Sequence, residues 1–293
     1  MSGFALPAAA VMQAYRDACR FDVIAFKPGN VSIEAAGHGM EARDFLRSAA
    51  VSAPWLGGEG LGVGERIQQA VAATRAAVGC NTTLGILLLA APLASAALNP
   101  SPEVDLQRRL RDVLAKLSVA DAVGAFAGIQ LAAPGGLGDA AVADVRDTPR
   151  ITLLQAMALA AERDAIAAQY GNDYAAVFGI GLPALVTALA SAEHQSDAVL
   201  AVYLEILAAM PDTHIARKHG EVIAEGVRQR GLAVACLRKA CENPGAYSVA
   251  LRAFDNELKA AGHNPGTTAD LTVASLFAFE LAQALRECRP PPE

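Results

Sequence analysis

Apolar residues recur at helical spacing along almost the whole chain, and this pattern restricts the fold more than any other sequence feature. Short breaks rich in Pro, Gly, Asn and Asp separate the periodic segments, as expected between neighbouring antiparallel helices. The pattern predicts an all-α fold: a single multi-helix, bundle-like domain over residues 1–293, with a polar cleft at its helix ends. Residues 1–10 are expected to form a flexible N-terminal tail. The expected helices cover 11–24, 44–52, 64–78, 84–98, 103–117, 120–131, 151–170, 173–192, 196–209, 214–229, 233–242, 246–261 and 268–288.

The composition supports helices packed at close range. Hydrophobic residues make up 53% of the chain but aromatic residues only 5%, so the core must be built mainly from Ala, Leu, Val and Ile. Ala and Leu are strong helix formers, and the β-branched residues are scattered, without the alternation of a strand.

The composition argues against nucleic-acid binding, against a membrane segment, and against a zinc or CxxC cysteine site. The net charge is −6 without a basic tract, which argues against nucleic-acid binding. The most apolar run, 84–98, is shorter than the roughly 20 residues that a membrane span needs, so no membrane segment is expected. The five cysteines form no CxxC pair and no zinc-site spacing. They are therefore expected to be reduced, mostly buried thiols of a cytoplasmic protein.

The first polar segment, residues 26–40, combines a lysine, several glycines and a histidine. Lys27 precedes Pro28, which biases it away from the α conformation, and glycines on both sides of His38 let backbone approach a ligand. One interpretation places Lys27 on phosphate and His38 as proton acceptor or phosphate donor. The other is a helix C-cap followed by an ordinary surface loop, and the residues alone leave both open.

Two further breaks have equally simple structural explanations. Asn81 precedes the apolar segment 84–98, where it either caps a helix or, with Thr82, offers an amide and a hydroxyl to a cleft. The glycine-rich stretch 135–150 does not complete GxGxxG and follows no strand, so a Rossmann site is rejected. Its carboxylates, Asp147 among them, either suit Mg²⁺ or are solvated loop charges.

The segment 211–220 gives the clearest physical indication of a ligand. Asp212 or Thr213 can cap a helix, which places His214, Arg217 and Lys218 on one side of its first turns. Cations beside a helix N-terminus conflict with the helix dipole, and a bound anion would relieve that conflict.

Two more segments concentrate polar residues. Residues 162–170 insert Arg163, Asp164 and Tyr170 into an Ala-rich stretch, either as buried polar groups or as an ion-paired surface. Residues 264–270 place Asn264 and Asp270 on either side of a Pro-Gly turn, with Thr267 or Thr268 as a helix cap. Capping explains much of this second segment but not its density of polar groups.

Taken in order, these segments resemble the triphosphoribosyl-dephospho-CoA synthase family from about Ala18 to the final helix. The motifs that carry the resemblance are 27–32, 37–40, 81–82, 212–214 and 264–270. The resemblance implies an all-α transferase that uses ATP and dephospho-CoA. A ribose hydroxyl of dephospho-CoA would displace adenine from C1′ of ATP, and Mg²⁺ would sit on the transferred triphosphate. The product would be a prosthetic-group precursor.

Motifs and resemblance together give the candidate site residues. Those assigned to catalysis are His38, Asp44, Asp212 and Asp270. Those assigned to phosphate or substrate binding are Lys27, Gly29, Asn30, Ser32, Asn81, Thr82, Arg163, Tyr170, Thr213, His214, Arg217, Lys218, Asn264, Gly266 and Thr267. Those assigned to metal binding are Asp147, Asp164, Asp212 and Asp270.

Two alternatives remain open at this stage. The chain lacks the Arg-Gly-rich, Glu-containing stretch that classical members carry in mid-chain, and it is similar to a divergent branch from methanogens and methylotrophs. Such a protein would act on a phosphorylated intermediate of methanofuran- and tetrahydromethanopterin-linked one-carbon cofactor biosynthesis. The second alternative is a non-catalytic nucleotide-binding or scaffold protein. A homodimer is also open, since Ala-rich helices suit a dimer face.

Overall fold

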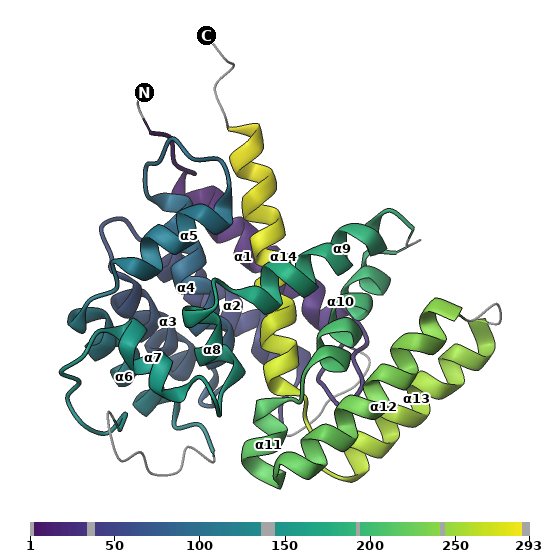
Figure 1. The fold of residues 1–293 in the computed structure, drawn as a ribbon. Helices are drawn as coiled ribbons and strands as arrows, with labels where there is room; N and C mark the ends of the chain where they lie inside the picture. Colours follow the sequence, from purple (N-terminus) through teal and green to yellow (C-terminus); the bar gives the residue numbers. More distant parts are fainter. Residues whose placement is uncertain (1–2, 34–38, 136–143, 192–193, 241–243, 289–293) are drawn as a thin grey trace.

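Helices are the only regular elements among the residues that the computed structural model describes, namely 3–33, 39–135, 144–191, 194–240 and 244–288 (Figure 1). The prediction of an all-α fold is confirmed. The elements are α1 (Ala8–Ile24), α2 (Ala42–Leu56), α3 (Val63–Val78), α4 (Leu84–Leu98), α5 (Leu106–Ala115), α6 (Val119–Ala132), α7 (Leu153–Ala160), α8 (Ala165–Gly171), the π-helix η1 (Val177–Gly181), α9 (Leu182–Leu189), α10 (Gln195–Ala209), α11 (Thr213–His219), α12 (Glu221–Ala240), α13 (Pro244–Ala260) and α14 (Gly266–Glu287).

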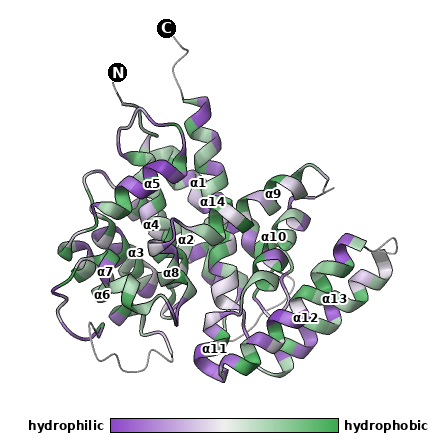
Figure 2. Cartoon of the chain, viewed as in Figure 1, coloured by the Kyte–Doolittle hydropathy of each residue, from purple (hydrophilic) through white to green (hydrophobic). Residues whose placement is uncertain are grey.

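The main core is built around α4. Every residue from Ile86 to Ala97 is buried, and the helix carries apolar side chains on all sides. A helix of that kind must be covered on every face, and α1, α3, α5 and α14 pack against it. In Figure 2 the interior helices are mostly green or pale, whereas the outer helices α5 and α12 carry more purple. The expected helix over 84–98 is confirmed at both ends.

A second, smaller apolar cluster joins α10 and α11 to the α12–α13 pair, which lies to one side of the molecule (Figure 1). Its centre includes Leu207, Ile215, Val227 and Phe254. Helices α10 and α14 contribute to both clusters, so they connect the two parts of the structure. The single-domain organisation stays a prediction.

Several helix boundaries differ from the sequence-based expectation. The expected helix 173–192 is a turn followed by the π-helix η1 and α9, and two other differences have a clear local cause. The expected helix 151–170 is divided into α7 and α8, because Asp164 leaves the helical conformation and accepts hydrogen bonds from the N–H groups of Ile166 and Ala167. The break expected near residue 230 lies instead at Gly220, whose φ of +94° ends α11. Helix α12 continues through Gly231.

The N-terminal segment is more ordered than a ten-residue tail. Helix α1 already begins at Ala8, and Leu6 is buried. Phe4 exchanges backbone hydrogen bonds with Ser101, and Arg109 donates to the carbonyl oxygens of both residues. Described residues of the expected tail therefore pack on the body of the protein, and their anchor is a side chain in α5.

Membrane and cysteine expectations can be compared directly with the structure. Over the described ranges, no single helix has both the length and the apolar character to cross a membrane; α10 and α11 reach those limits only as a pair bent by 55°. Cys19 is buried as expected, but Cys236 and Cys288 are exposed, which corrects the expectation of mostly buried thiols. Cys241 lies outside the described residues.

Helices α3 and α6 come into backbone contact at two glycines. A Cβ atom on Gly64 would lie 2.2 Å from the carbonyl oxygen of Asp121, and one on Gly124 would lie 2.4 Å from the carbonyl carbon of Gly64. The Gly64 N–H donates to Asp121 Oδ1 at 3.0 Å. Neither glycine position has space for a methyl group.

This contact reverses the usual effect of replacing a helical glycine. Gly64→Ala is expected to destabilise the protein by about 1–3 kcal/mol, because the methyl group must push backbone apart. Gly226→Ala, on the exposed side of α12 with nothing within 4 Å, serves as the control and is expected to stabilise by about 0.5–1 kcal/mol. Urea unfolding of the two variants measures both values, and a Gly64→Ala protein as stable as the wild type would contradict the close approach.

Candidate active site

A cavity of about 320 Å³ lies where the first turns of α4, α11 and α14 meet the last turn of α1. Its size is at the lower end of the roughly 300–1,000 Å³ of ligand pockets. Its polar lining consists of Asp22, Asn30, Asn81, Thr82, Asp164, His214, Arg217, Lys218, Asn264, Thr267 and Asp270. Its apolar lining includes Met40, Phe45, Leu84, Ile86, Leu88, Ile129 and Ile166. This is the polar cleft at helix ends that the sequence predicts.

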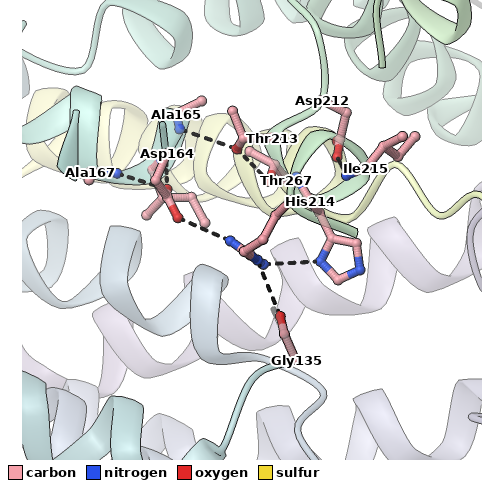
Figure 3. A network of polar contacts seen from close by, with 11 residues as sticks. Gly135, Asp164, Ala165, Ala167, Asp212, Thr213, His214, Ile215 and Thr267 are labelled. Atoms are coloured by element: carbon pink, nitrogen blue, oxygen red, sulfur yellow. Dashed lines mark hydrogen bonds and ion pairs between the residues drawn. The ribbon is translucent and has the colours of Figure 1, made fainter. Parts of the chain in front are cut away.

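Arg217 lines the cavity and contacts three residues, Asp164, Gly135 and His214, which are labelled in Figure 3. Its guanidinium donates to Asp164 Oδ2 and to the carbonyl oxygen of Gly135, each at 3.3 Å, and lies 3.4 Å from His214 Nδ1. His214 and Arg217 are three residues apart on α11, so they project from the same side of the helix. The contacts fix a cation beside Asp164. Arg217 and Lys218 lie in the last turn of the short helix α11, so the expected conflict with the dipole at a helix N-terminus is wrong, because α11 ends at His219.

Lys218 adds a second cation to the same wall. It is exposed and lines the cavity beside Gly135, and within the described part of the chain no carboxylate pairs with it. The expected grouping of His214, Arg217 and Lys218 on one side of a helix is therefore present. An anionic group entering the cavity would meet two positive charges at this corner.

Asp212 was expected to act in catalysis or metal binding, but the structure gives its oxygens other partners. The residue is buried, and its Oδ1 accepts from the N–H of Ile215 at 3.0 Å. Its Oδ2 accepts from both the N–H and the hydroxyl of Thr268 at 2.8 Å. Burial raises the pKa of Asp212, and these hydrogen bonds oppose the shift. Asp212 thus joins α11 to α14 and does not line the cavity.

A pair of threonines reinforces the same junction. Thr213 Oγ1 lies 3.1 Å from Thr267 Oγ1 and accepts from the N–H of Ala165, while Thr267 Oγ1 accepts from the N–H of His214 (Figure 3). Thr267 lines the cavity and Thr213 stands behind it. Three helices, α8, α11 and α14, are therefore connected by hydroxyl groups directly under the polar wall.

Asp270 is the carboxylate that enters the cavity with the fewest contacts. It lies just after the first turn of α14, directly against α4, where a Cβ atom on Gly85 would be only 2.0 Å from its Oδ2. No hydrogen bond to it is found among the described residues. Burial raises the pKa of Asp270 well above its usual range, and the charges of Asp212, Asp22 and Asp164 raise it further, while Arg217 lowers it.

The structure adds Asp22, a residue that the sequence did not single out. It lines the cavity from the last turn of α1 and forms a buried ion pair with Lys27, at 3.2 Å between Nζ and Oδ2. Burial raises the pKa of Asp22 and lowers that of Lys27, and each charge opposes the shift of the other. The available signal was an acidic residue on the apolar face of α1, beside Cys19 and Val23.

Amide and hydroxyl groups complete the polar lining. Asn30 Nδ2 donates to Asn264 Oδ1 at 2.9 Å, which ties the loop after α1 to the turn before α14. Asn81 Oδ1 accepts from the N–H of Leu84, so both interpretations of this residue hold: it supports the start of α4 and it lines the cavity. Thr82 Oγ1 lies 2.6 Å from Ser48 Oγ.

Several candidates from the 26–32 segment lie beneath the cavity and outside its lining. Gly29 has a φ of +76°, and its N–H donates to Asp255 Oδ1 at 2.8 Å. A Cβ there would lie 2.8 Å from Leu258 Cδ1. Ser32 is buried away from the cavity. Lys27 is fully buried and points at Asp22, which corrects the expectation that it contacts phosphate.

Four more candidates are placed elsewhere, and one is not described. Asp44 accepts from the N–H of Glu41 as part of a capping box, and Tyr170 is buried with its hydroxyl donating to the carbonyl oxygen of Leu88. Arg163 and Asp147 are exposed outside the cavity. The physical reason is that each occupies a helix cap, a core position or a turn surface. His38 lies outside the described residues.

Carboxylates reach the cavity from three directions, yet the described residues contain no group of three or more His, Cys, Asp or Glu side chains arranged to hold a metal ion. Of the four expected metal ligands, Asp164 and Asp270 line the cavity and Asp147 and Asp212 do not. Mg²⁺ commonly binds through one or two carboxylates together with substrate phosphates and water. Asp164 and Asp270 fit that mode.

Known proteins share this fold. A crystal structure of a candidate triphosphoribosyl-dephospho-CoA synthase from Archaeoglobus fulgidus superposes with a TM-score of 0.63 at 25% sequence identity, covering 82% of this chain and 98% of that one. None of the curated proteins compared with the chain matches it.

The family model for ATP:dephospho-CoA triphosphoribosyl transferase (CitG) matches residues 8–289, almost the whole chain. The match and the structural relative agree with the family resemblance of the sequence motifs. Neither supports the one-carbon cofactor alternative or the scaffold alternative. The chain is therefore a transferase that belongs to the ATP:dephospho-CoA triphosphoribosyl transferase family.

Proposed function

We propose that this chain moves the triphosphoribosyl group of ATP to a ribose hydroxyl of dephospho-CoA and releases adenine, as a step in prosthetic-group assembly. The observation that carries the proposal is the division of one cavity into a cationic corner and a carboxylate wall. Arg217 and Lys218 form the corner, where Asp164 pairs with Arg217, and Asp22 and Asp270 form the carboxylate wall from α1 and α14. A triphosphate suits the corner, and a reacting sugar that gains positive charge suits the wall.

The two ends of ATP need groups of opposite charge: carboxylates near the reacting ribose and cations near the triphosphate. The acceptor hydroxyl oxygen forms a bond to C1′ of the ATP ribose, and the C1′–N bond breaks with its electron pair going to adenine. The hydroxyl proton must leave, and positive charge develops on the sugar in an oxocarbenium-like transition state. We assign proton removal to Asp270, whose carboxylate enters the cavity and whose raised pKa favours accepting a proton at neutral pH.

At the other end, the triphosphate would be bound by Arg217, Lys218 and the hydrogen-bond donors of Asn264 and Thr267. The apolar surface of Leu84, Leu88 and Ile166 would hold the adenine ring before its release. Mg²⁺ would be held by the triphosphate together with Asp164, which lies beside Arg217, so that Asp270 is left as the base; the ion would supply charge neutralisation on the phosphate oxygens. ATP, dephospho-CoA and Mg²⁺ are the small molecules that the proposal requires.

Location and assembly follow as further parts of the proposal. We propose a cytoplasmic location, because ATP and dephospho-CoA are metabolites of the cytoplasm. A homodimer is retained as a proposal, since exposed apolar side chains such as Val123, Leu131 and Leu159 lie on α6 and α7. Sedimentation of the purified protein measures the oligomeric state.

The direct test is mass-spectrometric detection of adenine and of the triphosphoribosylated product after incubation with ATP, Mg²⁺ and dephospho-CoA. Both products are expected. Folded protein that releases no adenine would contradict the proposed function. Omitting dephospho-CoA separates transfer from simple hydrolysis of the glycosidic bond.

Replacing the proposed base should remove activity without harming the fold. Asp270→Asn is expected to lower kcat by about 10²–10⁴-fold. The raised pKa of Asp270 means that the folded state binds its proton more tightly than the unfolded state, so wild-type stability falls as pH rises above the usual aspartate range near 4. Asp270→Asn removes this loss, and its Tm at neutral pH should equal or exceed that of the wild type.

Activity and thermal unfolding measured across pH check both parts of this prediction. The wild-type kcat/KM should rise with pH through the raised pKa of Asp270. Asp112→Asn, an exposed carboxylate on α5, is the control with unchanged activity. An Asp270→Asn protein with full kcat would exclude Asp270 as the base.

Lys218→Ala tests the cationic corner. The KM for ATP is expected to rise about tenfold, because one charge-assisted hydrogen bond to phosphate contributes about 1.5 kcal/mol. The kcat value should change little if the contact is the same in the ground and transition states. Steady-state kinetics with ATP varied gives both numbers, with the exposed Lys116→Ala as control. An unchanged KM would place the triphosphate elsewhere in the cavity.

A further inference from the structure

The Asp22 carboxylate combines deep burial with an unused oxygen. The residue is 5% exposed and lines the cavity, and its Oδ2 pairs with Lys27. Its Oδ1 is buried and has no hydrogen-bond partner among the described residues. A buried acceptor left without a partner costs about 1–3 kcal/mol, more when it is charged. Such an atom, in a residue that lines the cavity, indicates a group whose partner a ligand would supply.

Lys27 has no direct route to a ligand. Its side chain is 0% exposed, and its Nζ donates to the carbonyl oxygens of Asp22 and Ala25 in addition to its ion pair. The segment after Lys27 is fixed from below: the Tyr203 hydroxyl donates to the carbonyl oxygen of Pro28 at 2.7 Å, and the Gly29 N–H donates to Asp255. Lys27 can therefore act on the cavity only through Asp22.

Asp22 and Asp270 face the same cavity from packed helices, α1 and α14. The charge of each raises the pKa of the buried Cys19 thiol, and the charge of Asp22 raises that of Asp270. Two carboxylates near one reacting sugar can divide the work between proton transfer and charge stabilisation. Lys27 gives Asp22 a counter-ion that Asp270 lacks, so the two environments differ.

We propose that Asp22 is a second catalytic carboxylate, whose Oδ1, without a partner among the described residues, contacts the transferred ribose and stabilises its positive charge, and that Lys27 is the positioning residue that keeps Asp22 ionised. This inference rests on the proposed function. In the step described above, the hydroxyl proton goes to Asp270 and the glycosidic electron pair to adenine, while Asp22 exchanges no proton. Without Lys27, a buried Asp22 would take up a proton and lose its charge.

The test is a double-mutant cycle on adenine release with ATP, Mg²⁺ and dephospho-CoA. Asp22→Asn is expected to lower kcat by about 10²–10³-fold, as for loss of one transition-state contact, with the KM for ATP changed by less than about threefold. Lys27→Met should lower kcat similarly. The variant carrying both changes should match Asp22→Asn, because Lys27 acts only through Asp22. Lys116→Met and Asp112→Asn, both exposed on the α5 side of the molecule, are the matched controls.

The outcomes separate this inference from the proposed function. If the wild type is active and Asp22→Asn keeps the wild-type kcat, the proposed role of Asp22 is wrong, and the proposed function still stands. A rise in the KM for ATP caused by Lys27→Met in the Asp22→Asn background overturns the role of Lys27, since it would mean a direct phosphate contact. A folded wild type that releases no adenine overturns the proposed function first. If Lys27→Met alone does not fold, the variant with both changes, which has no unpaired buried charge, supplies the comparison.

Discussion

The carboxylate of Asp212 accepts hydrogen bonds from the starts of two helices, α11 and α14, and the polar wall of the cavity depends on that double attachment. Helix N-termini leave N–H groups without intrahelical partners, and Asp212 provides acceptors for both sets at once. Because the two helices are fixed at their first turns, the side chains that follow have fixed relative positions. Arg217 and Asp270 face one cavity although more than fifty residues separate them in the sequence.

A buried residue also supports the wall of the cavity that contains Asp22. Lys27 is removed from solvent, and its ammonium group donates to Asp22 and to backbone carbonyl oxygens. The sequence suggested that Lys27 binds phosphate, but in the structure it holds another side chain. Burying this pair costs desolvation energy that an apolar pair would avoid. A buried ion pair beneath a polar cavity is therefore better explained by what it does for the cavity than by stability.

The fold was largely predictable because its information is local and repeated. Apolar periodicity places most of the helices, and the uniformly apolar segment of α4 identifies the helix at the centre. For the site, the sequence predicted which segments contribute to it but not which side chains of those segments enter the cavity. Capping and ligand binding use the same residue types, Asp, Asn, Ser and Thr, and only the tertiary contacts separate Asp212, which caps, from Asp270, which enters the cavity. Asp22 was missed since a single acid inside a helical pattern has no motif around it.

The contact between Gly85 and Asp270 constrains related sequences as well as this one. It stands at the second position of α4, and its missing side chain leaves the space in which the Asp270 carboxylate lies. The positions 85 and 270 are thus not free to change independently over evolutionary time. Where a related sequence carries a larger residue at the position of Gly85, the side chain at the position of Asp270 must point elsewhere or be replaced by a smaller residue. Covariation of this pair would distinguish lineages that keep the carboxylate in place from lineages that have rebuilt the cavity for other chemistry.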